Sequence, residues 1–263
     1  MVTISIFANT ELKKPERVRA FADHFARRMH CTARGAVIGF SFMCLLALSA
    51  YGGTVQVPLK DGWRFVKADD PAAGTNLTLG AMSDILDRAN RGDTSSAPVF
   101  GWAQPAFDDS TWSKVRVPHD WGVEKPFDPD RAYGDAFLDM TGIGWYRYKV
   151  KIESGKLRVG ERCVSIPESG RVFFECDGAM SYAMLYLNGK FLGGWPYGYT
   201  RWRVDMTPWL SSDGDNTIAV RCHNVKDSSR WYTGGGLFRD CRLLVCPEDY
   251  VLPGSVFITT PEV

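Results

Sequence analysis

A histidine and an aspartate stand side by side in the sequence VRVPHDW, where His119 and Asp120 follow Pro118 between residues typical of strand and turn. A histidine paired with an aspartate can activate a serine nucleophile, as it does in serine hydrolases. The sequence contains no Gly-x-Ser-x-Gly nucleophile elbow that would supply such a serine. The remaining alternatives are a strand-end corner built for packing and a contact with a ligand.

Asp108 and Asp109, in the sequence FDDSTW, are a second group that could do chemistry. Retaining glycosidases use two carboxyl groups about 5 Å apart, one as acid/base and one as nucleophile. Neighbouring side chains in a turn point apart, and aspartates commonly accept hydrogen bonds from the backbone of such turns. We therefore expect both aspartates to be structural, and we expect no catalytic residue in this chain.

The charge balance argues against a polyanionic partner. The 263 residues include 31 Lys and Arg against 30 Asp and Glu, a net charge of +1, so no long-range field favours nucleic acid or an anionic membrane. Nine Trp and ten Tyr could supply surfaces that stack against rings, including the apolar faces of sugars. The Cys and His spacings match no zinc site, and we expect no metal or other cofactor.

The first 50 residues differ from the rest of the chain. From Met29 a basic start is followed by an apolar run from about Ala36 to Leu48 and by small residues up to Ala50, which is typical of a secretory signal peptide. The run is short for a membrane span, which needs about 20 apolar residues, although an uncleaved anchor is the alternative. We interpret residues 1–50 as an over-extended start plus a signal peptide, and we expect a secreted or periplasmic protein without a stable membrane span.

Cleavage near Ala50 would remove Cys31 and Cys44 and leave five of the seven cysteines. Export permits disulfides, but five is an odd number and free cysteine is a common core residue. We expect buried thiols, with at most one disulfide.

Beyond residue 50, short apolar or alternating runs separated by Gly, Asp and Ser predict strand after strand. Asn188-Gly189 lies between two such runs and predicts a hairpin with a type I′ turn. The helical pattern from Leu79 lies inside a long polar insertion. Because strands and helices do not alternate, the sequence predicts an all-β sandwich. The clearest strand patterns begin at Trp145, Arg171, Tyr182, Asn216 and Phe238.

Five motifs, in this order and spacing, resemble the N-terminal sugar-binding domain of glycoside hydrolase family 2, the β-galactosidase family: GWRFVKADD, FDDSTWSKVRVPHDW, GIGWYRYKV, AMLYLNGKFLGGWPYGYTRWRVDMT and SSRWYTGGGLFRDCRLLV. The resemblance implies a jelly-roll β-sandwich, similar to galactose-binding domains, over residues 51–248. Residues 249–263 resemble the first strand of the immunoglobulin-like domain that follows in this family. A catalytic (β/α)8 barrel comes next there, so we expect the chain to be a fragment that lacks the barrel.

The resemblance also implies that Asp120 reaches toward the barrel mouth and accepts hydrogen bonds from hydroxyls of the bound sugar. A carboxylate suits this role because it offers up to four acceptor positions and makes charge-assisted bonds. We expect His119 to support Asp120 or to touch the substrate. The alternative is that Asp120 caps the turn while Trp121 packs; if Asp120 contacts the sugar, Asp120→Ala should melt close to wild type.

The sequence HNVKDSSRWYTGGGLFRD is the second candidate. The resemblance implies that Arg230 and Trp231 lie beside the active site, where they bind substrate or pack on the barrel. The glycine run 234–236 would permit another domain or a ligand to approach closely. The alternative for this loop is packing between domains.

A row of aromatic residues could form a stacking platform, but its alternation with glycines and arginines favours a strand edge that packs on its sheet. The row consists of Trp195, Tyr197, Tyr199 and Trp202.

Three functions remain open. The first is a substrate-positioning domain of a secreted O-glycosyl hydrolase that acts on a β-linked glycan or oligosaccharide and is inactive without its barrel. The second is a free-standing carbohydrate-binding module, and the third is a purely structural interaction domain. Galactosides, glucuronides and mannosides are all cleaved within the family, so the sugar stays open.

Overall fold

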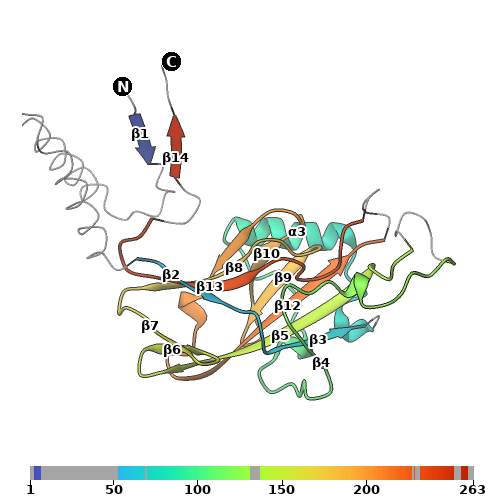
Figure 1. The fold of residues 1–263 in the computed structure, drawn as a ribbon, viewed down its shortest axis with the longest axis horizontal. Helices are drawn as coiled ribbons and strands as arrows, with labels where there is room; N and C mark the ends of the chain where they lie inside the picture. Colours follow the sequence, from blue (N-terminus) through green and yellow to red (C-terminus); the bar gives the residue numbers. More distant parts are fainter. Residues whose placement is uncertain are drawn as a thin grey trace, which may run out of the picture. The chain divides into compact units, whose positions relative to one another are not determined.

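The computed structural model describes residues 3–6, 53–68, 70–130, 137–226, 228, 232–251 and 256–259. They belong to two compact units, one of residues 1–54 with 249–263 and one of residues 55–248. In the first unit, β1 (Thr3–Ile6) pairs antiparallel with β14 (Val256–Thr259), as Figure 1 shows. The predicted signal peptide, from Met29 to Ala50, lies outside the described residues.

Residues 55–248 form two antiparallel sheets with one buried apolar cluster between them, which confirms the predicted β-sandwich. The larger sheet has the order β10-β9-β12-β5-β3-β4, with β6 paired to β5 and β7 to β6, and the smaller sheet has the order β11-β8-β13-β2. The bounds are β2 (Val55–Pro58), β3 (Trp63–Lys67), β4 (Ser113–Val115), β5 (Gly142–Glu153), β6 (Lys156–Val159), β7 (Arg162–Ser165), β8 (Arg171–Cys176), β9 (Ala183–Leu187), β10 (Lys190–Trp195), β11 (Trp202–Asp205), β12 (Gly214–Asn224) and β13 (Cys241–Cys246).

The central position of β5 and β12 in the larger sheet explains why both strands are buried over most of their length. Their antiparallel register places Tyr146 opposite Val220. Alternate side chains of β12, such as Ile218 and Val220, point into the core between the sheets. Ala219 points the other way and packs in a second cluster on the outer face of the larger sheet. Both faces of the central strands are therefore buried.

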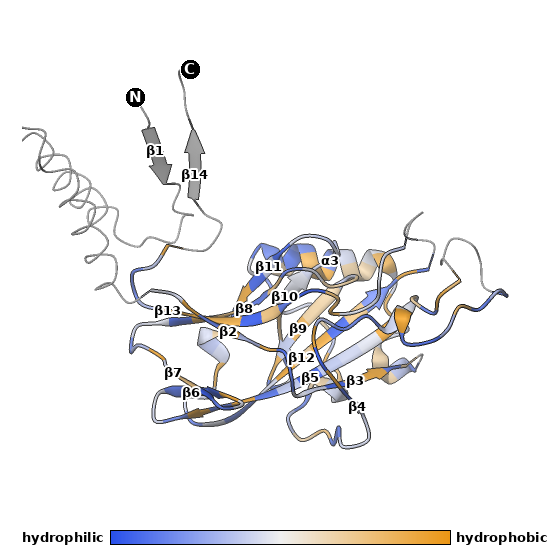
Figure 2. Ribbon diagram, viewed as in Figure 1, coloured by the Kyte–Doolittle hydropathy of each residue, from blue (hydrophilic) through white to orange (hydrophobic). Residues whose placement is uncertain are grey.

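The polar insertion of residues 70–112 covers this outer face. Its helix α3 (Leu79–Asn90) starts at Thr78, whose Oγ1 accepts a hydrogen bond from Ala81 N at 3.2 Å. Figure 2 shows apolar and polar residues side by side along α3, and the helix buries Met82, Ile85 and Leu86. The predicted helix is therefore confirmed, and it is an amphipathic cover for the sheet. The insertion also contains η1 (Pro71–Ala73) and η2 (Gly101–Ala103).

A buried arginine of β5 holds the insertion in place. Arg147 donates Nε to Asp109 Oδ2 at 2.7 Å, and its other nitrogens donate to the carbonyls of Trp102, Gln104 and Phe107. Asp108 Oδ1 accepts a hydrogen bond from Ser110 N at 2.9 Å. Both aspartates are therefore structural, as expected from the sequence.

Arg221, on β12, fixes the start of the same insertion. It is fully buried and donates Nε to Ala73 O at 2.8 Å and Nη2 to Gly74 O at 2.9 Å. Burial lowers the pKa of Arg221 to about 10. The guanidinium group stays charged at neutral pH and forms hydrogen bonds with carbonyl groups.

Asn188 and Gly189 join β9 to β10 with φ angles of 52° and 83°, so the predicted hairpin turn is confirmed. Among the described cysteines, four are buried as expected, but Cys163 on β7 is exposed. In the described part of the chain, no helix has the length and apolar character that a membrane crossing requires.

Candidate functional site

Four loops meet at one end of the sandwich, after β4, β8, β10 and β12. Main-chain hydrogen bonds tie them together: His119 N donates to Leu237 O at 2.8 Å, and Met180 and Gly236 exchange bonds of 2.9 and 3.0 Å. Tyr182 N donates to Pro196 O at 3.0 Å. We call this group the loop cluster; it comprises the described residues 116–130, 137–141, 177–182, 196–201, 225–226, 228 and 232–240.

Asp120 lies at the centre of the loop cluster. Its Oδ1 accepts hydrogen bonds from Gly122 N at 2.9 Å, which caps η3 (Trp121–Val123), and from Gly235 N at 2.8 Å. Its Oδ2 accepts a hydrogen bond from the Tyr232 hydroxyl at 2.5 Å. A carboxylate offers about four acceptor positions, so one position, on Oδ2, has no donor among the described residues.

Tyr232 extends the polar surface beside Asp120. Its side chain is 41% exposed. Burial and the hydrogen bond to Asp120 raise the pKa of Tyr232 well above its usual range, so the hydroxyl remains a donor at neutral pH. With its proton directed at Asp120, the Tyr232 oxygen can accept a hydrogen bond from a ligand hydroxyl.

His119 has protein partners at both ring nitrogens. Its Nδ1 lies 2.7 Å from the Tyr146 hydroxyl, and its Nε2 lies 2.7 Å from Glu124 Oε1. Burial raises the pKa of Tyr146 far above its usual range, so that hydroxyl keeps its proton. The histidine ring also packs on Phe65, with 4.6 Å between the ring centroids. These contacts favour a role for His119 in positioning the loop that carries Asp120.

Trp121 explains the run of glycines in the facing loop. The indole is buried and donates Nε1 to Met140 O at 2.8 Å. A Cβ atom on Gly235 or Gly236 would lie 2.6 or 2.8 Å from the Trp121 ring, closer than packed atoms approach. The sequence predicted that this run lets a domain or a ligand approach; the close approach in the structure is to Trp121 of the same domain.

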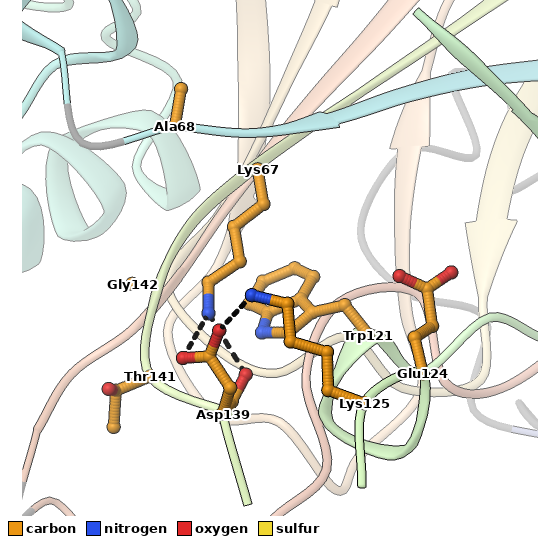
Figure 3. A pocket seen from close by; sticks show the side chains of 8 residues that line it. All are labelled: Lys67, Ala68, Trp121, Glu124, Lys125, Asp139, Thr141 and Gly142. Atoms are coloured by element: carbon orange, nitrogen blue, oxygen red, sulfur yellow. Dashed lines mark hydrogen bonds and ion pairs between the residues drawn. The ribbon is translucent and has the colours of Figure 1, made fainter.

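A polar pocket of about 570 Å³ opens beside Trp121. Figure 3 shows Lys67 and Lys125 both directed at Asp139: Lys67 Nζ lies 2.7 Å from Asp139 Oδ1, and Lys125 Nζ lies 2.9 Å from Oδ2. Two ammonium groups, the Asp139 carboxylate and Glu124 can each bind hydroxyl groups of a ligand. The lining residues are Lys67, Ala68, Trp121, Glu124, Lys125, Asp139, Thr141 and Gly142.

The structure describes only part of the predicted site. Asp120 and His119 lie in the loop cluster, whereas Arg230 and Trp231 lie outside the described residues. Sequence reasoning missed the hydrogen bonds that Tyr232 and Gly235 donate to the Asp120 carboxylate. It also missed the ion pair between Lys67 and Asp139. No local pattern marks these contacts, because the partners of Asp120 are 112 and 115 residues away in the sequence.

Protein-family models give no match to this chain. Among curated proteins, the β-galactosidase BoGH2A of Bacteroides ovatus is 32% identical over 164 residues, which are 61% of this chain and 18% of that protein. A solved β-glycosidase from Bacteroides vulgatus covers 73% of this chain with 20% of its own, at 27% identity and a TM-score of 0.51. The solved β-glucuronidase of Bacteroides uniformis covers 74% of this chain with 18% of its own, at 26% identity and a TM-score of 0.51.

The chain thus spans about a fifth of the length of these relatives. Sequence similarity and the shared β-sandwich point to the same group of proteins, and they bear out the resemblance carried by the five motifs. Over 61–74% of its length, this chain is similar to the N-terminal region of larger β-galactosidases and β-glucuronidases of glycoside hydrolase family 2.

Proposed function

We propose that residues 55–248 are the sugar-binding, substrate-positioning domain of a secreted or periplasmic β-glycosidase whose catalytic groups belong to a barrel outside this chain. The observation that carries the proposal is the Asp120 carboxylate, which three donors among the described residues hold in one orientation, with one acceptor position that no described donor fills. The names of the relatives support a β-galactoside or β-glucuronide as the substrate class.

The geometry suits a pair of neighbouring sugar hydroxyls. One hydroxyl donates to the open position on Asp120 Oδ2, and a second donates to the Tyr232 oxygen. The carboxylate makes a charge-assisted bond, which contributes about 1.5–3 kcal/mol. Because the hydrogen bonds from Gly122 and Gly235 fix the carboxylate before the sugar arrives, little side-chain entropy is lost on binding.

Asp120→Asn should weaken sugar binding while leaving the fold intact. The asparagine oxygen can still accept from Gly122 and Gly235, whereas its amide nitrogen replaces the charged acceptor that faces the ligand. We expect affinity to fall about ten- to a hundredfold, measured by NMR titration of the 263-residue chain with methyl β-galactoside, β-glucuronide and β-mannoside. Asp108→Asn, in the exposed turn that bonds Ser110 N, is the matched control.

Equal affinities of Asp120→Asn and wild type would show that Asp120 is only a turn cap. Alanine is less informative here, because it leaves the N–H groups of Gly122 and Gly235 without their acceptor. The structure therefore revises the sequence-based expectation that Asp120→Ala melts close to wild type; a lost cap of this kind costs about 0.5–2 kcal/mol.

Two alternatives make different predictions. A purely structural domain would bind none of the three glycosides. A free-standing module would bind them without gaining affinity or activity from a catalytic partner. The chain spans about a fifth of the length of its relatives. This share favours a domain of a larger enzyme over a purely structural domain and over a free-standing module.

A further inference from the structure

The aromatic row runs from the end of β10 to the start of β11, and its members differ in burial. Trp202 is buried and packs on Phe174 at a centroid distance of 5.4 Å, and Trp195 donates Nε1 to Thr200 Oγ1 at 2.8 Å. The two tryptophans are therefore structural, as the sequence favoured. Tyr197 and Tyr199 are 56% and 37% exposed, so strand-edge packing does not account for them.

Ring contacts connect these two tyrosines to Phe238, which lies near Asp120. The Tyr197 and Tyr199 rings lie 5.6 Å apart, and the Tyr199 and Phe238 rings lie 6.0 Å apart. Phe238 adjoins Gly234, at which a Cβ atom would lie 3.6 Å from Phe238 Cγ and 3.0 Å from Asp120 Oδ2. Tyr197, Tyr199 and Phe238 thus form a continuous aromatic strip that begins beside the Asp120 carboxylate.

Packing and a hydrogen bond restrain the backbone of the strip, and a polar group lies at its edge. Arg239 donates Nη1 to Tyr199 O at 2.9 Å, and its guanidinium lies 5.3 Å from the centre of the Phe238 ring. Gly198, between the tyrosines, packs on Met180, because a Cβ atom there would lie 2.4 Å from Met180 Cε. A surface that is ordered in advance loses little entropy when it binds a ligand.

We propose that the aromatic strip binds the sugar rings next to the one that Asp120 contacts, so that the domain takes an oligosaccharide rather than a simple glycoside. Aromatic side chains with a polar tip suit a ligand that is apolar on one face and hydroxylated at its rim. Exposed Arg239 offers further donors to those hydroxyls. The inference rests on the proposed function, since the first sugar is the one held by Asp120.

The test is the dependence of affinity on oligosaccharide length. The 263-residue chain would be titrated, by isothermal calorimetry, with β-linked galacto-, gluco-, manno-, xylo- and glucuronate-containing series of one to five residues. We expect affinity to rise from the monosaccharide to the trisaccharide. Tyr197→Ala and Tyr199→Ala should each reduce the affinity for the longer members about three- to tenfold without changing the affinity for the monosaccharide, and Tyr199→Phe should retain it.

Trp209→Ala is the control, because Trp209 is 44% exposed on η5 (Thr207–Trp209), where Thr207 Oγ1 accepts a hydrogen bond from Val172 N at the start of β8. Melting temperatures of all variants show whether the fold is kept. If wild type binds but affinity does not depend on length, or the tyrosine variants keep the length dependence, the strip is not a sugar site and this inference is wrong. If no series binds wild type, the proposed function fails and the inference fails with it.

Discussion

Arg147→Met is expected to lower the free energy of unfolding by about 3–5 kcal/mol, because it removes one partner of a buried ion pair. The Arg147 side chain is fully buried and the Asp109 side chain is 12% exposed, with Nε and Oδ2 at 2.7 Å. Methionine keeps the apolar stem but removes the Arg147 donors of the Asp109 carboxylate and of the Trp102 and Phe107 carbonyls, whereas Gln104 O keeps its hydrogen bond from Phe107 N at 3.1 Å. Urea unfolding followed by tryptophan fluorescence measures the loss.

The loss of stability should appear first in the insertion of residues 70–112, since Arg147 bonds to residues 102–109 of this insertion. Limited proteolysis below the unfolding midpoint should therefore cut the variant within this insertion before it cuts the strands. Arg158→Met is the control: Arg158 is 54% exposed and pairs with Glu153 on the surface, so its loss should cost less than about 1 kcal/mol. Similar unfolding midpoints for the two variants would contradict the role assigned to Arg147.

The sequence predicted the sandwich because the information for it is local. Alternating apolar runs determine which face of a strand is buried, and Asn188-Gly189 adopts the positive φ angles that its turn requires. The packing of the insertion was not predictable in this way. Arg147 and Arg221 resemble surface residues in a strand, and the bond from Arg221 to Ala73 spans 148 residues of sequence.

In the candidate site, too, the sequence predicted the local feature but not the contacts between distant residues. The motif VPHDW identified Asp120, but neither spacing nor composition indicates that Tyr232 and Gly235 hold its carboxylate. The glycine run illustrates the difference most clearly: the sequence indicated an unusual backbone path there, and only the packed structure identifies Trp121 as the group that requires it.

Gly236→Ala is the sharpest test of that packing. Gly236 has φ of +88°, and a Cβ atom would lie 2.0 Å from the Tyr146 hydroxyl oxygen and 2.8 Å from Trp121 Cε3. The backbone cannot move aside easily, because the N–H and C=O of Gly236 both bond to Met180. Backbone strain and overpacking together should cost about 2–6 kcal/mol, measured as the shift of the urea unfolding curve.

Gly214→Ala separates these two costs. Gly214 has nearly the same φ angle, +91°, but no heavy atom outside its two chain neighbours lies within 4 Å of its Cβ position. It should therefore lose only the strain of a left-handed residue, about 1–2 kcal/mol. The difference between the two variants measures the contact of Gly236 with Trp121 and Tyr146. Tyr146 bonds to His119, and Trp121 follows Asp120 in the chain. Gly236→Ala should therefore also weaken sugar binding, whereas Gly214→Ala should not. Equal stability and equal binding of the two variants would refute the packing of this loop against Trp121.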